Sequence, residues 1–223
     1  MIGFDAVGHD YGGGALFGDV SLTLEKGSFH FLTGPSGAGK STFLKLCYGE
    51  LRPSQGQISL AGQDLAAMSR DDLARARQRI GVVHQDCRFL DHLSVEANVA
   101  LPLRVTGRAL DEQNLSDLLA WVGLRGQARA LPPTLSGGER QRTALARAVI
   151  TQPEVLLADE PTGNLDWEMS QRLMTLIVEL NRMGTAVLIA THDLNLIRFV
   201  KTQVSARVLR LSRGKVIAAG AEL

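Results

Sequence analysis

Short apolar runs alternate along this chain with longer amphipathic stretches, which predicts a mixture of strands and helices. Three runs in the first sixty residues are bounded by glycines and turn residues and predict the strands of an opening β lobe: 21–24, 29–32 and 58–60. Three later runs are apolar throughout and are separated by stretches of helical spacing: 80–83, 155–158 and 186–190. This alternation predicts parallel strands that are buried on both faces, as in an α/β fold.

A different pattern occupies residues 86 to about 133, where helical spacing dominates and predicts a second, helical lobe. The clearest helix follows Asp111 and carries apolar residues at helical spacing: Leu115, Leu118, Leu119 and Val122. We expect a single domain over residues 1–223. Its catalytic core and β lobe comprise about 1–85 and 136–223, its helical subdomain comprises about 86–135, and a hairpin of residues 207–211 and 215–218 closes the core.

A further helix is predicted from Ser69, because Asp72 follows three residues later as in a capping box. Three arginines come next, Arg75, Arg77 and Arg79, and we expect a solvated helix face there; the alternative is a binding patch.

Composition removes several classes of partner and compartment. The 223 residues are 45% hydrophobic and 21% charged, with a net charge of +1, so no global field attracts nucleic acid or anionic lipid. No apolar run approaches the roughly 18 residues of a membrane span, and no signal-peptide pattern opens the chain, so we expect a cytoplasmic protein. Cys47 and Cys87 are too few for a disulfide framework and are expected to be reduced thiols.

Residues 34–41 read GPSGAGKS and match the pattern G-x-x-x-x-G-K-[ST] between the strand at 29–32 and an apolar-faced helix. Glycines let successive backbone N–H groups point at phosphate oxygens, and the helix N-terminus adds its dipole. Lys40 is expected to hold the β- and γ-phosphates of a nucleotide, and Ser41 to bind Mg²⁺. The alternative, a glycine-rich turn that matches by chance, has a likelihood of about one per cent. The expected phosphate-binding residues are Gly34, Pro35, Ser36, Gly37, Ala38, Gly39, Lys40, Ser41 and Thr42.

Two carboxylates, Asp159 and Glu160, directly follow the apolar run 155–158. Ligands of open α/β sheets bind at the carboxyl ends of the strands, so both acids are expected to face the phosphates. Asp159 is the candidate Mg²⁺ partner through the metal's water shell, and Glu160 the candidate general base for an attacking water. Pro161 biases Glu160 away from helical dihedral angles and predicts the end of the strand. The alternative is a strand that ends in solvated acids.

Residues 135–139 read LSGGE and predict a helix start, with Ser136 as the cap and Glu139 reaching back to it. Two glycines in the first turn leave bare N–H groups at a dipole end that suits a phosphate. The sequence here resembles the ATP-binding cassette family, whose LSGGQ signature binds the γ-phosphate of the opposite protomer's ATP. The resemblance assigns that role to Ser136, Gly137, Gly138 and Glu139.

The resemblance covers essentially the whole chain and implies a P-loop NTPase fold with a RecA-like mixed core, an antiparallel β lobe and a helical subdomain. By resemblance, Tyr11 stacks on adenine, although a strand-edge tyrosine is the alternative, and Gln85 senses Mg²⁺ and the attacking water. Residues 164–166 (Asn-Leu-Asp) resemble a loop that crosses the dimer interface, with Asp166 as its carboxylate. His192 resembles the histidine that contacts the γ-phosphate, whereas a lone histidine is more often structural. Four other histidines match no motif: His9, His30, His84 and His92.

Four segments are similar to the cell-division, FtsE-type branch of the family: 31–34, 36–42, 157–166 and 191–197. The resemblance implies a homodimer that sandwiches two Mg·ATP and closes on ATP binding. It also implies a peripheral position on the cytoplasmic face of the inner membrane, with an FtsX-type integral membrane partner. By the same resemblance, the ATPase is expected to control peptidoglycan hydrolysis at division through this partner, and other division proteins are further candidate partners.

Partner contact is expected on the helical lobe, at Phe89, Leu90 and Leu93, because docking of a partner helix needs an apolar groove. The alternative is that these residues only pack the lobe. Two other functions remain open. The first is the ATPase of a lipoprotein-release or macrolide-export transporter, because those ATPases share segment 157–166. The second is a nucleotide-dependent scaffold that would turn over little ATP.

Overall fold

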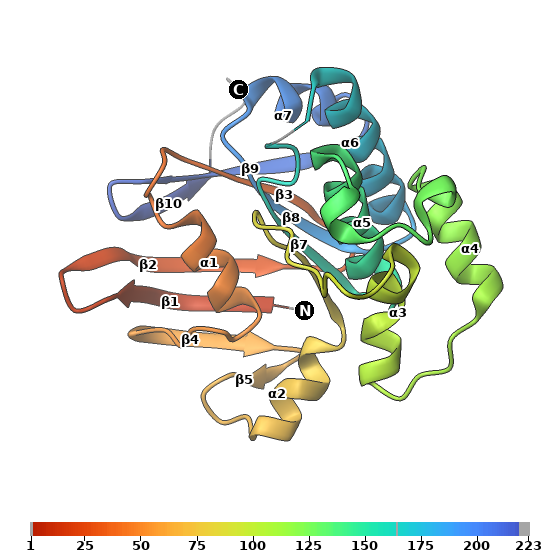
Figure 1. Ribbon diagram of the computed structural model, residues 1–223. Coiled ribbons are helices and arrows are strands. Elements are labelled where there is room, and N and C mark those ends of the chain that lie inside the picture. The colour runs from red at the N-terminus through yellow and green to blue at the C-terminus, as the bar shows by residue number, and fades with distance from the viewer. Residues whose placement is uncertain (1, 164, 219–223) are drawn as a thin grey trace.

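The computed structural model describes residues 2–163 and 165–218 and contains two sheets (Figure 1). The smaller sheet has the strand order β2-β1-β4-β5 and is antiparallel throughout. Its strands are β1 (Ile2–Asp10), β2 (Ala15–Leu24), β4 (Gln55–Leu60) and β5 (Gln63–Asp64). The predicted β lobe is therefore present, with the runs 21–24 and 58–60 lying in β2 and β4. The run 29–32 instead forms β3 (Phe29–Thr33) of the larger sheet, so its assignment to the lobe is wrong.

The larger sheet has the order β10-β9-β3-β8-β7-β6. All neighbours are parallel except β10, which pairs antiparallel with β9 as the predicted hairpin. Its strands are β3 (Phe29–Thr33), β6 (Ile80–Val83), β7 (Val155–Asp159), β8 (Ala186–Ala190), β9 (Ala206–Ser212) and β10 (Lys215–Ala218). β8 is buried at every position, which explains why its run is apolar throughout. The prediction of a mixed α/β core is confirmed.

The first strand, β1, was not predicted. Its register against β2 shifts three times, between Phe4 and Val7, between Val7 and His9, and between His9 and Asp10. Each shift moves side chains to the other face of the sheet, so the two-residue alternation that marks a strand is lost from the sequence.

Seven α-helices and two short 3₁₀ helices lie in the described part of the chain: α1 (Lys40–Cys47), α2 (Arg70–Arg77), α3 (Val95–Val105), α4 (Glu112–Trp121), η1 (Arg125–Gln127), η2 (Pro132–Thr134), α5 (Gly137–Val149), α6 (Trp167–Arg182) and α7 (Leu194–Lys201). The predicted helix starts at Ser69, Asp111 and Ser136 are confirmed, since each side chain accepts hydrogen bonds from the first turn of α2, α4 or α5. α7 was not predicted. Within the described ranges, no helix is both long and apolar enough to cross a bilayer.

The arginines near α2 do more than cover a solvated face. Arg77 donates from Nε to the carbonyl of Tyr48 (2.9 Å) and from a terminal nitrogen to the carbonyl of Gly49 (2.8 Å). Arg79 forms a bidentate ion pair with the carboxylate of Glu154, with N···O distances of 2.7 and 2.6 Å. All three arginines are exposed, so the predicted solvated face is confirmed, and two of the guanidinium groups also brace neighbouring segments.

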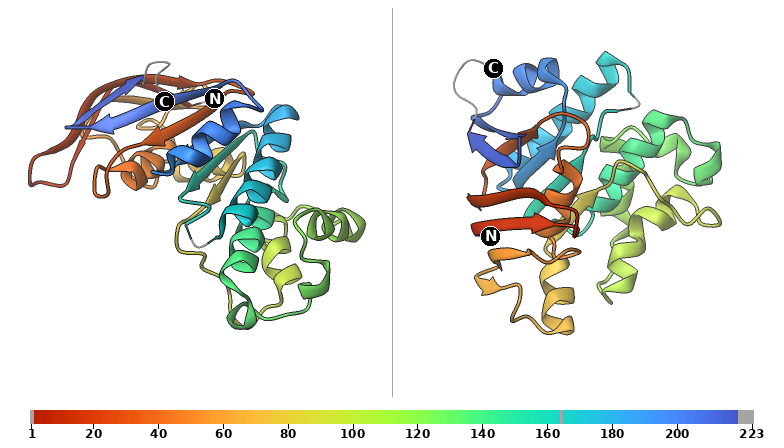
Figure 2. Two further views of the ribbon diagram at one scale, coloured as in Figure 1. Left: turned by 90° about the horizontal axis from the view of Figure 1, so that it is seen from above. Right: turned by 90° about the vertical axis from the view of Figure 1, so that its left-hand side faces the viewer.

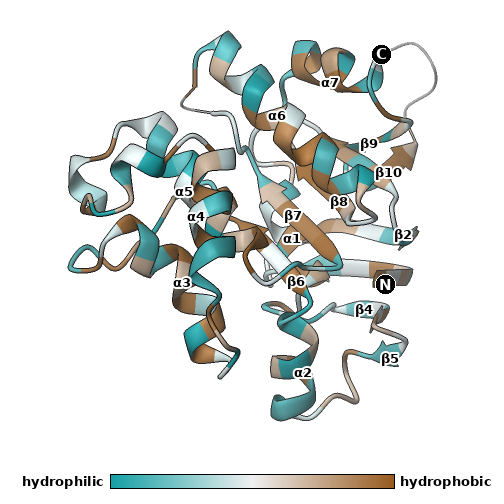
Figure 3. Cartoon of the chain, turned by 90° about the vertical axis from the view of Figure 1, so that its right-hand side faces the viewer, coloured by the Kyte–Doolittle hydropathy of each residue, from teal (hydrophilic) through white to brown (hydrophobic). Residues whose placement is uncertain are grey.

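Three apolar clusters organise these elements. α1 lies between the two sheets, where Phe43 stacks on Phe4 with ring centroids 4.7 Å apart. α5, α6 and α7 cover the other face of the larger sheet, and Figure 3 shows the apolar β7 and β8 beside them. A third cluster joins α3 and α4 to α5, and these two helices project to one side of the sheets (Figure 2). Cys47 is buried and Cys87 half-buried, and both are free thiols, as predicted.

Candidate functional site

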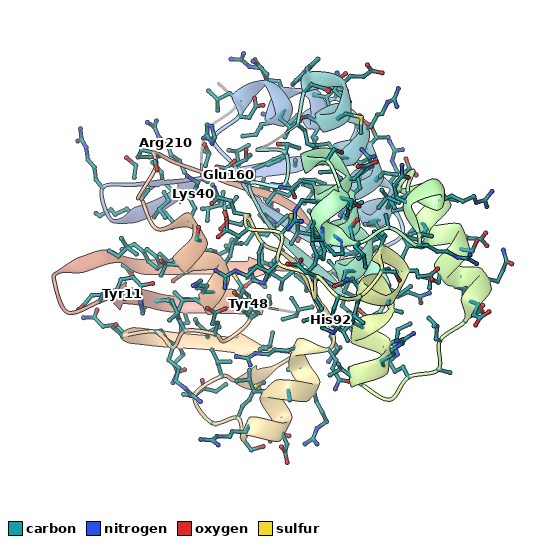
Figure 4. All side chains as sticks on the ribbon, in the orientation of Figure 1. Tyr11, Lys40, Tyr48, His92, Glu160 and Arg210 are labelled. Carbon is teal, nitrogen blue, oxygen red and sulfur yellow. The ribbon has the colours of Figure 1, made fainter. Side chains whose placement is uncertain are left out.

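A cavity of about 630 Å³ lies where the carboxyl ends of β3 and β7 and the turn after β8 meet the N-terminus of α1. Residues that the sequence singled out make most of its wall: Tyr11, Pro35, Ser36, Gly37, Gly39, Lys40, Ser41, Thr42, Gln85, Asp159, Glu160 and His192. Leu16 also lines it, although no motif pointed to that residue. Figure 4 shows Lys40 and Glu160 close together. The fold thus gathers residues from five separate segments into one place.

Two glycines of the phosphate loop are required by their surroundings. At Gly34, φ is 156° and an added Cβ would lie 2.3 Å from the carbonyl oxygen of Leu211 in β9. At Gly39, φ is 103° and an added Cβ would lie 2.8 Å from the Leu16 side chain. Gly39 is also the N-cap of α1, and among the described residues no side chain caps this helix end. Its backbone N–H groups are thus left for an anion.

Lys40 is buried and its ammonium group is turned onto its own loop. Nζ donates to the carbonyl oxygens of Gly34 (2.9 Å) and Pro35 (3.3 Å) and lies 4.0 Å from Oε1 of Glu160. A buried ammonium needs such partners in the absence of phosphate oxygens. The same group can therefore transfer its hydrogen bonds to a nucleotide.

Glu160 and His192 form a close pair at the cavity. Nδ1 of His192 lies 2.7 Å from Oε1 of Glu160, and an ionised carboxylate can only accept, so Nδ1 is the donor. The Glu160 side chain is 12% exposed, whereas that of His192 is 74% exposed. The pair leaves Nε2 of His192 available for a further partner.

The backbone at Glu160 corrects one expectation. β7 ends at Asp159, as the following proline predicted, and the Glu160 N–H donates to the carbonyl of Ala190 (2.9 Å). However, φ of Glu160 is 44°, so the residue is left-handed instead of extended. The hydrogen bond to Ala190 holds this conformation although Pro161 favours extended angles for the residue before it, and a left-handed residue with a Cβ costs about 1–3 kcal/mol. Such strain is found at sites where a side chain must be aimed.

Asp159 is partly buried, and this burial raises the pKa of its carboxyl group above the usual range. A hydrogen bond from the Ser41 hydroxyl opposes the rise in pKa. The oxygens of Asp159 and Ser41 are thus adjacent, and Gln85 lines the same cavity. Mg²⁺ prefers oxygen ligands and takes few from protein when phosphates and water supply the rest, so this donor set fits it.

Tyr11 lies at the rim of the cavity, at the end of β1. Its ring is 65% exposed, its hydroxyl is 3.0 Å from Oγ1 of Thr42, and its edge meets the His9 ring at 4.7 Å between centroids. An anchored hydroxyl with an open face is compatible with stacking on a base. The adenine contact stays a prediction.

The second predicted motif lies elsewhere on the surface. Ser136 caps α5 by accepting from the Glu139 N–H (3.3 Å), and the Glu139 carboxylate accepts from the N–H and the hydroxyl of Ser136 (2.8 Å each). These hydrogen bonds lower the pKa of Glu139. No residue of 136–139 is among the described residues that line the cavity. The capping box is therefore confirmed, and its exposed helix end is separate from the phosphate loop.

Asp166 also lies away from the cavity and caps α6, where its carboxylate accepts from the Met169 N–H (2.8 Å). Leu165 packs near Gly138, whose added Cβ would be 3.1 Å from it, so this loop contacts the start of α5. Asn164 lies outside the described residues.

Sequence reasoning missed the buried Asn98 of α3. Its amide donates to the carbonyls of Leu90 (3.1 Å), Leu93 (2.9 Å) and Ser94 (3.1 Å), and its oxygen accepts from the Leu90 N–H (2.9 Å). This network holds the segment before α3 in place. A single asparagine in an apolar helix gives no sequence signal for such a role.

Comparison with known proteins agrees with this arrangement. A family model described as ABC transporter matches residues 17–163. The cell division ATP-binding protein FtsE of Haemophilus influenzae is 47% identical over 203 residues, covering 89% of this chain and 93% of the relative. The chain belongs to the ATP-binding cassette (ABC) family. FtsE of Escherichia coli K12 is 46% identical over 218 residues, 96% of each chain, and FtsE of Bacillus subtilis is 42% identical over 189 residues, 84% of this chain and 83% of the relative.

Solved structures show the same ABC fold. The dimeric cassette MJ0796, in a post-hydrolysis state with ADP and Pi, has a TM-score of 0.86 and 31% identity over 97% of this chain and 96% of that one. A second dimeric structure of MJ0796 has a TM-score of 0.85 and 32% identity with the same coverage. The chain is therefore an ABC ATPase that binds and hydrolyses ATP, and it is similar to FtsE of several bacteria.

Proposed function

We propose that this ABC ATPase works as a head-to-tail homodimer that sandwiches two Mg·ATP. One observation carries the proposal: the phosphate-loop cavity and the Ser136 end of α5 are separate, and each has exposed backbone donors. Two copies facing each other can cover both ends, with a γ-phosphate held between Lys40 of one subunit and residues 136–139 of the other. Asp166, at the start of α6, belongs to the same interface.

In this proposal the bound nucleotide replaces contacts that the protein makes with its own residues. Lys40 exchanges the carbonyls of Gly34 and Pro35 for phosphate oxygens, at no cost in unpaired donors. Ser41, Gln85 and Asp159 would hold Mg²⁺ through their oxygen atoms, and the ion would offset the negative charge that builds up during phosphoryl transfer.

Glu160 acts as the general base that orients the attacking water. The His192 hydrogen bond at 2.7 Å and the left-handed backbone hold its carboxylate toward Lys40. Nε2 of His192 then contacts the γ-phosphate. Hydrolysis removes that phosphate and with it the contacts between the subunits, so the dimer opens.

We place this cycle in cell division, as the names of the curated relatives indicate. Dimer closure on the cytoplasmic face of the inner membrane would be relayed through an FtsX-like membrane partner to control peptidoglycan hydrolysis. The partner would bind the helical subdomain, about residues 86–135 of the single domain. Leu90 is 42% exposed there and is held by Asn98. The guanidinium groups of Arg140 and Arg147 each lie over the Phe89 ring, with carbon-to-centroid distances of 5.2 and 4.7 Å.

Complementation tests the shared site directly. Lys40→Ala removes a phosphate ligand, and Ser136→Asp keeps a good helix cap but places a charge against the partner's γ-phosphate. Each variant alone should be inactive. An equimolar mixture should recover about a quarter of wild-type activity, because half of the dimers then contain one intact site, provided that subunits exchange freely. A mixture as inactive as its components would contradict the dimer.

The partner surface is tested by Leu90→Glu, with Leu131→Glu as the matched control because Leu131 is 44% exposed in a different segment. We expect Leu90→Glu to abolish co-purification with the membrane partner while ATP binding persists. Unchanged co-purification would remove Leu90 from the docking surface.

A further inference from the structure

Tyr11, at the end of β1 (Figure 4), is followed by a loop that gives its ring no side chain to pack against. Residues 12–14 are all glycine, and nothing lies within 4 Å of a Cβ added at any of them. Gly12 and Gly14 have positive φ, at 88° and 117°. The orientation of the Tyr11 ring, which is 65% exposed, must therefore be set by other parts of the chain.

Two side chains contact the ring. The Tyr11 hydroxyl lies 3.0 Å from Oγ1 of Thr42 in α1, and the ring meets that of His9 with centroids 4.7 Å apart and planes inclined by 88°. The hydroxyl contact fixes one point, about which the ring could still turn. The His9 contact supplies a second point, so the plane of the Tyr11 ring depends on it.

His9 is itself firmly held. It is 7% exposed, and its Nδ1 lies 3.1 Å from the carbonyl oxygen of Arg52, which can only accept, so Nδ1 is the donor. Ser54 holds the backbone on either side of His9, because its N–H donates to the Gly8 carbonyl (2.9 Å) and its hydroxyl accepts from the Asp10 N–H (3.1 Å). A buried and anchored ring therefore supports an exposed one.

This anchor has a cost. Nε2 of His9 is buried and has no hydrogen-bond partner among the residues that the structure describes. A buried polar atom without a partner lowers stability, and a purely apolar ring would avoid that loss. Such a cost is typical of positions where a side chain must be held in one orientation.

We propose that His9 is a positioning residue that holds the Tyr11 ring in the plane on which the adenine of ATP stacks. The proposal rests on the adenine contact of Tyr11, which is itself a prediction. It works by preorganisation, because a ring that is fixed before binding loses less freedom when a base stacks on it. The effect of His9 should therefore concern the base and not the phosphates.

A double-mutant cycle in the full chain tests the coupling between the two rings. Calorimetry gives the dissociation constant of a non-hydrolysable ATP analogue with magnesium for wild type, both single variants and the double variant. We expect Tyr11→Ala to weaken binding about tenfold and His9→Ala about fivefold. The double variant should bind no more weakly than Tyr11→Ala, because His9 acts only through that ring. Losses that add, or wild-type affinity in His9→Ala, would overturn the proposal.

Two further substitutions separate the ring of His9 from its hydrogen bond. His9→Gln keeps a donor for the Arg52 carbonyl but removes the ring, and it should bind the analogue as weakly as His9→Ala. His9→Phe keeps a ring and should stay within about twofold of wild type. His92→Ala is the control, an exposed histidine with no assigned role. Stronger binding by His9→Gln than by His9→Phe would overturn the ring contact as the cause.

Inorganic triphosphate, which lacks the base, separates positioning from a structural role. Its affinity should be the same in wild type and in every His9 variant, whereas a distorted phosphate loop would weaken it too. In steady-state hydrolysis, KM for ATP should rise about fivefold in His9→Ala while kcat stays within about twofold. Equal losses of affinity for triphosphate and for the ATP analogue would overturn the proposal.

The remaining outcomes concern the assumptions on which the proposal stands. Wild-type affinity in Tyr11→Ala would contradict the adenine contact, and with it the role of His9. The binding measurements need only the isolated chain. Absence of an ATP-dependent dimer would therefore contradict the proposed function and not this inference.

Discussion

The phosphate-loop cavity and the Ser136 end of α5 each contain a helix N-terminus, but their charged groups are paired in different ways. In the cavity, the Lys40 ammonium lies 4.0 Å from the Glu160 carboxylate, so opposite charges are paired within the site, and His192 hydrogen-bonds to the same carboxylate. At α5, Ser136 and Glu139 satisfy only each other and the helix start. The cavity must therefore exchange contacts when nucleotide binds, whereas the α5 end is already in its final form. In this account, nucleotide binding contributes its free energy at the phosphate-loop cavity, and the Ser136 end of α5 makes that binding specific for the closed dimer.

Removing the Lys40 ammonium group from the cavity should have the largest effect. Lys40→Ala should reduce ATP hydrolysis at least about a hundredfold, because it removes a charged donor aimed at transferring phosphate. Lys45→Ala is the matched control, since Lys45 lies on the same helix and pairs with Glu50 on the surface (3.1 Å). Steady-state kinetics measure both variants. Equal losses in the two would mean that the effect comes from the helix and not from the site.

Next in size is a backbone effect in the phosphate loop. Gly34→Ala should lower the free energy of unfolding by about 3 kcal/mol, because its Cβ would collide with the Leu211 carbonyl. Gly37→Ala should cost about 1 kcal/mol, since its φ of 76° is unfavourable but nothing lies near the added Cβ. Denaturant melts measure both. A Gly34→Ala variant as stable as wild type would contradict the close approach of β9.

A smaller effect should come from the buried acid. Asp159→Asn should raise Tm of the nucleotide-free protein by roughly 2 °C, a modest gain because solvent screens part of the charge. Burial raises the pKa of Asp159, so the ionised form costs stability above that pKa. The gap between variant and wild type should be full at neutral pH and close as pH falls through the folded-state pKa. A gap that widens in acid would reverse the assigned cause.

The smallest effect is expected at the α5 end. Glu139→Gln keeps both hydrogen bonds of the capping box but removes a carboxylate that, in the proposed dimer, faces the γ-phosphate held by the other subunit. ATP-dependent dimerisation should tighten about threefold, as for other exposed charges. Sedimentation measures it, and weaker dimerisation in Glu139→Gln would show that the carboxylate assists closure.

Sequence reasoning succeeded where the signal is contiguous in the chain and failed where it is not. The phosphate loop, β7 and the Ser136 cap are contiguous signals, in which each residue's role depends on neighbours a few positions away. Their position in the fold could therefore be predicted. β1 could not, because its repeated register shifts remove the alternation that marks a strand.

Contacts between distant segments were equally hidden. The His84 ring meets Tyr48 from the segment just after β6, 36 positions later in the chain, and Asn98 bonds to carbonyls of an irregular segment. Neither residue type suggests such a partner, since the contacts arise only when α1, β6 and α3 are packed together. The left-handed backbone of Glu160 was also unexpected, because the residue before a proline prefers extended dihedral angles.

The central claim is that one ATP site is built from two copies of the chain, and the Glu160→Gln variant tests it most directly. This substitution keeps the shape of the side chain but removes the general base, so bound ATP should persist between the subunits. Its molar mass is measured by light scattering during gel filtration with saturating magnesium and ATP. The account predicts twice the mass of the chain with ATP and a monomer with ADP. A monomer under saturating ATP would contradict the shared site.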